Sequence, residues 1–123
     1  MCAIIGALGK KLPSVEQFQK SRDTMAHRGP DDAGTYYSLK EGVALGHRRL
    51  SVVDLSKDGH QPFVSSDGRF VLTYNGEIYN YLELKEELKR EYNFKSKTDT
   101  EVLLAAYMMW GEKCLEKFNG MFA

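Results

Sequence analysis

Short apolar runs separated by turn-forming residues dominate the first 75 positions, and this pattern predicts β-strands joined by tight turns. Gly9 ends the first run, Glu41-Gly42 joins the second to the third, and Ser66-Asp67-Gly68 joins the last two as a hairpin. A β-branched run follows the third strand at 51–55. The predicted strands cover residues 2–8, 34–39, 43–49, 63–64 and 70–74.

Helical spacing of apolar residues replaces this pattern at 14–29 and again after position 80. Each predicted helix begins at a polar residue followed three positions later by Gln or Glu, namely Ser14 with Gln17, Asn80 with Glu83, and Thr98 with Glu101. The helices are predicted to end at Gly29-Pro30, near Tyr92 and at Gly111. A short helix at 112–118 and the opening of a strand at 121–123 complete the chain.

Strands followed by helices and then by another strand indicate an α+β fold with mostly antiparallel pairing. Because the last predicted strand has only begun at Ala123, we expect residues 1–123 to be part of a larger domain. The chain has 123 residues, 42% of them hydrophobic, which is typical of one soluble domain.

Charge and composition exclude several kinds of function. Seventeen basic and seventeen acidic residues give a formal charge of zero, so neither nucleic acid nor an anionic membrane is an expected partner. The sequence has no apolar run of membrane-spanning length and no secretory signal. Its two cysteines make no disulfide framework, which favours a reducing, cytoplasmic location. Scattered histidines and the lack of a phosphate-binding loop argue against a metal or nucleotide cofactor.

Cys2 is the first candidate for chemistry, because only the initiator methionine precedes it. Removal of Met1 would leave a thiol and a free α-amine on one residue, and an α-amine has a pKa of about 7.7–8.0. Cys2 would then supply both nucleophile and base, as N-terminal threonine and cysteine nucleophiles do. The alternative is that Cys2 is a small buried apolar residue.

Three further clusters each have a structural alternative. Of Arg48 and Arg49 at a strand end, one can face solvent while the other clamps a carboxylate with its planar fork. Asn75-Gly76 reads as a tight turn, but the Asn75 amide and the Gly76 N–H could bind an oxyanion. Asp99 suits a helix N-terminus, and it could equally pair with an ammonium group.

These clusters occur in the order of one known family. The chain resembles the N-terminal glutaminase domain of glutamine-dependent asparagine synthetases, a class II glutamine amidotransferase, over residues 2–123. The motifs that carry the resemblance are Met1-Cys2 with Ile4, HRGPDDAG from His27, GHRRLSVVDLS from Gly46, QP at Gln61, YNGEIYN from Tyr74 and KTDTE from Lys97.

The resemblance implies a four-layer αββα N-terminal-nucleophile hydrolase fold with two antiparallel sheets, incomplete on its C-terminal side. It implies hydrolysis of L-glutamine to glutamate and ammonia, which a C-terminal synthetase domain would use for asparagine synthesis. That domain, absent from residues 1–123, would bind ATP, magnesium and aspartate, and the glutaminase domain itself would need no cofactor. A strand missing from the sheet would leave an edge prone to pairing with a second copy.

The resemblance also implies a role for each matching residue. Cys2 would attack the amide carbon, and the Asn75 side chain with the Gly76 N–H would form the oxyanion hole. Arg49 would hold the α-carboxylate of glutamine, and Asp99 together with Glu77 would hold its α-amino group. The main chain expected to border the pocket is that of Leu50, Ser51, Val52 and Val53.

The chain departs from the family at Ala3, where glycine is usual, and a positive φ at that position would be strained. Two alternatives to asparagine synthesis remain. The same hydrolase could supply ammonia to another acceptor, or the domain could be a non-catalytic module, as retention of Met1 would favour.

Overall fold

The first half of the chain folds into a three-stranded antiparallel sheet. The computed structural model describes residues 2–52 and 57–123. Strands β1 (Ala3–Leu8), β3 (Val43–Arg49) and β2 (Asp32–Ser38) lie side by side in that order. Ala3 pairs with Arg48, and Asp32 pairs with Arg49. The predicted hairpin of the second and third strands is therefore confirmed, and its first strand begins two residues earlier than predicted.

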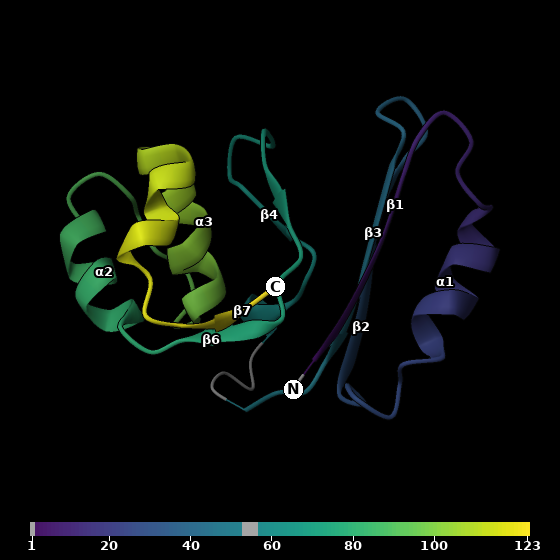
Figure 1. The fold of residues 1–123 in the computed structure, drawn as a ribbon, viewed down its shortest axis with the longest axis horizontal. Helices are drawn as coiled ribbons and strands as arrows, with labels where there is room; N and C mark the ends of the chain where they lie inside the picture. The colour runs from purple at the N-terminus through teal and green to yellow at the C-terminus, as the bar shows by residue number, and fades with distance from the viewer. Residues whose placement is uncertain (1, 53–56) are drawn as a thin grey trace.

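Helix α1 (Val15–Asp23) covers one face of this sheet (Figure 1). Its predicted capping box is confirmed, because the Gln17 backbone N–H donates to the Ser14 hydroxyl and the Gln17 side chain accepts from the Ser14 N–H. Phe18 is buried on the inner face of the helix, beside Gly46 of β3. The apolar stripe of α1 thus covers the side of the sheet that faces away from the rest of the chain.

The second half of the chain lies on the other side of the sheet (Figure 1). A 3-10 turn, η1 (Lys57–Gly59), leads into the hairpin of β4 (Phe63–Val64) and β5 (Val71–Leu72). A second antiparallel pair joins β6 (Gly76–Ile78) to β7 (Gly120–Phe122). The helical elements here are α2 (Tyr81–Leu88), α3 (Asp99–Trp110) and η2 (Gly111–Lys117), a 3-10 helix.

The main core lies between α2, α3 and the β6 strand. Its buried members include Ile78 of β6, Leu88 of α2 and Val102 of α3. Burying aliphatic side chains of this size is worth about 1.5–3 kcal/mol each. This core fixes the first turn of α3 beside β6, and both elements contribute to the site described below.

Two helices end before their predicted limits. Helix α1 stops at Asp23 because residues 24–28 continue in tighter turns, in which the N–H of Met25 and of Arg28 bonds three residues back. Helix α2 stops at Leu88, and residues 89–91 continue in turns, in which the Glu91 N–H bonds three residues back to the Leu88 carbonyl. The ring of Tyr92, just beyond, packs on Phe94 with the two ring centroids 4.8 Å apart. Helix α3 ends at Gly111 as predicted.

Asn80 precedes α2, but its side chain makes no capping bond. Its amide nitrogen donates to the carbonyl of Lys117 at 2.9 Å, and its oxygen accepts the N–H of Asn119 at 2.9 Å. The prediction that the Asn80 side chain caps α2 is therefore wrong. The side chain instead links the start of α2 to the segment before β7. The strand predicted at the end of the chain is confirmed as β7.

The strand pairing differs from the expected two sheets. Among the described residues, the strands form one three-stranded and two two-stranded antiparallel sheets. Of the β-branched run at 51–55, Ser51 and Val52 form no strand and residues 53–55 lie outside the described part. The fold is therefore a mixed arrangement of helices and small antiparallel sheets.

Candidate active site

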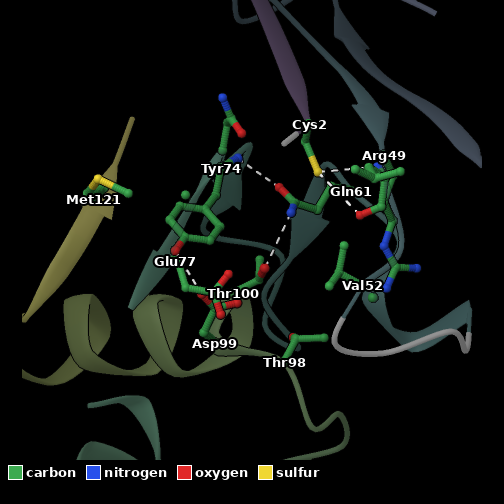
Figure 2. Close-up of a pocket in the computed structure, with 14 residues that line it drawn as sticks. Cys2, Arg49, Val52, Gln61, Tyr74, Glu77, Thr98, Asp99, Thr100 and Met121 are labelled. Carbon is green, nitrogen blue, oxygen red and sulfur yellow. Dashed lines mark hydrogen bonds between the residues drawn. The ribbon is translucent and has the colours of Figure 1, made fainter. Parts of the chain in front are cut away.

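A pocket opens where the start of β1, the end of β3, the β6–β7 pair and the first turn of α3 meet (Figure 2). The first and last strands of the chain both reach it. Its lining is contributed by Cys2, Arg49, Leu50, Val52, Gly59, Gln61, Tyr74, Asn75, Gly76, Glu77, Thr98, Asp99, Thr100 and Met121.

Cys2 lies directly before β1, with its thiol beside the chain that leaves β3. The Leu50 N–H lies 3.4 Å from Cys2 Sγ, and the Leu50 carbonyl lies 3.8 Å from the same sulfur. Asp31 supports this segment, because its carboxylate accepts the Ser51 N–H at 2.8 Å and its own N–H donates to the Arg49 carbonyl at 3.0 Å. The backbone around Leu50 therefore fixes the position of the Cys2 sulfur.

Arg49 is the last residue of β3, and its side chain is buried. Gly59 of η1 packs against its guanidinium so closely that a Cβ on Gly59 would lie 2.1 Å from Arg49 Nη2. His60 holds this turn in place by donating from Nδ1 to the Asp32 carboxylate at 2.7 Å. A side chain at position 59 would therefore displace the Arg49 guanidinium from its present position.

Asn75 and Gly76 do not form a tight turn, because the chain continues through them as a strand. Asn75 exchanges two backbone hydrogen bonds of 2.9 Å with Ala123. Gly76 begins β6 and lies so near β7 that a Cβ on it would be 2.4 Å from the Met121 carbonyl oxygen. The pairing of β6 with β7 therefore sets the backbone of both residues at the pocket wall.

Tyr74 is held on both of its backbone polar groups by buried side chains. Its N–H donates to Gln61 Oε1 at 2.7 Å, and its carbonyl accepts from His47 Nε2 at 3.0 Å. The Gln61 amide nitrogen in turn donates to Thr100 Oγ1 at 3.3 Å. Figure 2 shows Gln61 between Tyr74 and Thr100, with Cys2 beside it. Because burial lowers the pKa of His47, its imidazole stays neutral and donates through Nε2.

Asp99 stands in the first turn of α3, after the capping residue Thr98. Its Oδ2 accepts the Tyr74 hydroxyl at 2.8 Å and the Ile78 N–H at 3.0 Å. These two donors bracket Asn75, Gly76 and Glu77 in the sequence. The carboxylate therefore links the start of α3 to the Tyr74 side chain and to the backbone of Ile78.

The buried carboxylate of Glu101, two residues after Asp99 in the same turn of α3, has a different set of partners. It accepts the N–H groups of Lys95 and Ser96 at 2.6–3.1 Å and the Ser96 hydroxyl at 2.7 Å. The Thr98 hydroxyl accepts the Glu101 N–H, so the predicted cap of this helix is confirmed. Glu101 orders the loop that leads to Asp99, and it does not enter the pocket.

A comparison with known families matches the chain to a described domain. The sequence profile of the family described as a glutamine amidotransferase domain matches residues 1–123. The chain belongs to this glutamine amidotransferase family. None of the helices in the described ranges is long and apolar enough to cross a membrane.

Curated relatives of this glutamine amidotransferase domain are longer proteins. A putative glutamine-hydrolyzing asparagine synthetase of Methanocaldococcus jannaschii is 42% identical over 141 residues, which covers 100% of this chain and 27% of the relative. A glutamine-hydrolyzing asparagine synthetase of Bacillus subtilis is 41% identical, and the match covers 100% of this chain and 20% of the relative. A protein of Gibberella zeae named amidase chry2 is 40% identical, and the match covers 89% of this chain and 16% of the relative. The chain thus spans about a quarter or less of their length.

Most residues proposed for the amidotransferase site from the sequence line this one pocket. Ser51 does not line it, because its N–H is turned to Asp31, and Val53 lies outside the described residues. The pocket residues predicted from the sequence are Cys2, Arg49, Leu50, Val52, Asn75, Gly76, Glu77 and Asp99.

Sequence reasoning missed the residues that hold this constellation together. Gln61 and Tyr74 belong to the QP and YNGEIYN motifs, so the motifs contained a signal, but neither residue received a role. The concern about Ala3 is settled by the fold. Ala3 is buried in extended β1, and positive φ angles among the described residues occur only at glycines.

Proposed function

We propose that this domain hydrolyses L-glutamine to glutamate and ammonia with Cys2 as the nucleophile. The observation that carries the proposal is the convergence on one pocket of a thiol, a cation and two carboxylates, belonging to Cys2, Arg49, Glu77 and Asp99. Glutamine is a zwitterion with an amide at its far end. Its recognition therefore requires a cation and an anion set apart, with the nucleophile beyond them.

The reaction proceeds in two steps. The Cys2 sulfur attacks the amide carbon, and the α-amine of Cys2, free once Met1 is removed, takes the thiol proton and passes it to the departing ammonia. Water then attacks the resulting thioester and releases glutamate. The Asn75 side-chain amide and the Gly76 N–H donate to the oxyanion of both tetrahedral intermediates. Nucleophile, base and donors all come from the chain, so the proposed mechanism uses no cofactor.

Arg49 and the two carboxylates orient the substrate. The guanidinium suits the α-carboxylate because its planar fork can donate two parallel hydrogen bonds. Asp99, with Glu77, accepts the α-ammonium group, and the main chain of Leu50 and Val52 borders the bound side chain. Because α1 and α3 lie on opposite sides of the sheets, we also propose that the complete domain has the four-layer αββα arrangement.

In the whole protein, we propose that the ammonia supplies an ATP- and magnesium-dependent synthetase domain that converts aspartate to asparagine. The names and the greater length of the asparagine synthetase relatives support this acceptor. The relative named amidase chry2 supports the alternative of another acceptor.

Replacement of the nucleophile tests the proposed reaction. We expect Cys2→Ala to abolish ammonia release while glutamine still binds, because the ion-pairing groups remain. Cys114→Ala is the matched control, since Cys114 is buried in the core away from the pocket. Intact mass spectrometry with a diazoketone analogue of glutamine should show loss of Met1 and one adduct, absent from Cys2→Ala. Ammonia release by Cys2→Ala at the normal rate would refute the mechanism.

A further inference from the structure

The Asp99 carboxylate is held from one side only. The Tyr74 hydroxyl and the Ile78 N–H both donate to Oδ2, at 2.8 and 3.0 Å. None of the hydrogen bonds found among the described residues uses Oδ1. Two donors on one oxygen fix the plane of a carboxylate, and the second oxygen is left for a ligand at the pocket wall.

The Tyr74 hydroxyl is itself held in a fixed position. The residue is 3% exposed, and its ring extends from the β6 side of the pocket to the start of α3 (Figure 2). Burial, followed by the bond to Asp99, raises the pKa of Tyr74, so the hydroxyl remains a donor. The hydrogen bonds that Gln61 and His47 make to Tyr74 go to its backbone, not to its hydroxyl. The hydroxyl therefore orients Asp99, while the backbone bonds position Asn75 and Gly76.

We propose that Tyr74 is a specificity-determining residue, whose hydroxyl holds Asp99 so that Oδ1 receives the α-ammonium group of the substrate. The inference rests on the proposed function, in which Asp99 binds that group. It adds that the site discriminates against amides without a free α-amine, and that this discrimination depends on a phenolic oxygen that does not touch the substrate. Tyr74 is thus a positioning residue for recognition.

Tyr74→Phe separates the role of the hydroxyl, which orients Asp99, from the role of the backbone, which positions Asn75 and Gly76. The variant lacks the hydroxyl but keeps the ring and both backbone hydrogen bonds. Hydrolysis of L-glutamine should be measured together with inhibition by 5-amino-5-oxopentanoate, which is glutamine without its α-amine. We expect KM for glutamine to rise about tenfold, as for the loss of one modest hydrogen bond. The turnover number and the Ki of the analogue should stay within about twofold, because neither depends on Asp99 orientation.

Tyr37→Phe is the matched control, since it removes a hydroxyl that donates to the Pro13 carbonyl outside the pocket. It should change neither constant. If Tyr74→Phe weakens glutamine and the analogue equally, or leaves KM unchanged, the inference is overturned while the glutaminase proposal stands. If the unmodified protein does not hydrolyse glutamine, the proposed function fails first, and the inference fails with it.

Discussion

Gln61→Met tests whether the buried amide at the centre of the site acts through its hydrogen bonds or through its shape. Methionine has nearly the same length and volume as glutamine, but it cannot accept the Tyr74 N–H or donate to Thr100. Leaving a buried N–H without an acceptor costs about 1–3 kcal/mol, and loss of the longer bond to Thr100 adds about 0.5 kcal/mol. We therefore expect the free energy of unfolding to fall by about 2–3 kcal/mol.

Urea denaturation measures this loss. With a typical m-value of about 1–3 kcal/mol per molar for a small domain, the unfolding midpoint should fall by roughly 0.7–3 M. Gln19→Met is the matched control, because Gln19 is exposed on α1. If both variants unfold at the same urea concentration, the amide contributes only packing, and the reasoning about Tyr74 is refuted. In the folded variant we also expect a turnover number at least about tenfold lower, because the proposed oxyanion donors, Asn75 and Gly76, follow Tyr74 directly.

Two other buried groups give predictions about stability. Glu101→Gln places an NH₂ group against the N–H donors of Lys95 and Ser96, so the free energy of unfolding should fall by about 2–4 kcal/mol; a loss below about 1 kcal/mol in urea denaturation would contradict this. Because burial lowers the pKa of His47, its contribution to stability is complete above the unfolded pKa of about 6.5 and is lost as the pH falls below it towards the folded pKa. Urea midpoints at about pH 7.5 and 5.5 should differ less in His47→Gln than in the exposed control His27→Gln, and equal differences would count against a neutral buried imidazole.

The sequence predicted local structure well and distant contacts poorly. The Ser14 capping box needs only residues three positions apart, and it forms as expected. Asn80 has the same local pattern, but its partners lie 37 and 39 residues away, and no nearby residue indicates them. The strand predicted at 63–64 is confirmed as β4, whereas the one predicted at 70–74 forms only over Val71–Leu72, the two residues that pair with β4.

The residues of the site divide in the same way. Side chains proposed to contact the substrate, such as a thiol or a carboxylate, can be recognised from their residue type and from the motif that contains them. Gln61 and Tyr74 act through main-chain bonds across 13 positions, and the reason for their presence is visible only in the fold. Asn75-Gly76 has the local pattern of a tight turn but does not form one, because its backbone pairs with residues at the end of the chain.

The end of β3 explains which of two adjacent arginines serves the pocket. Successive side chains of a strand point to opposite faces, so His47 and Arg49 share one face while Arg48 lies on the other. Arg48 accordingly reaches the Asp23 carboxylate at the end of α1, 3.5 Å away, whereas His47 and Arg49 face the second half of the chain.

Both faces of β3 are covered, and therefore hydrophobicity alone could not assign the two arginines. One strand end thus sets three parts of the site through its backbone and alternate side chains. Leu50 positions the thiol, Arg49 supplies the cation, and His47 anchors the carbonyl before Asn75. A change that shifts β3 by a single residue would exchange these faces, and it would remove the cation and the Tyr74 anchor together.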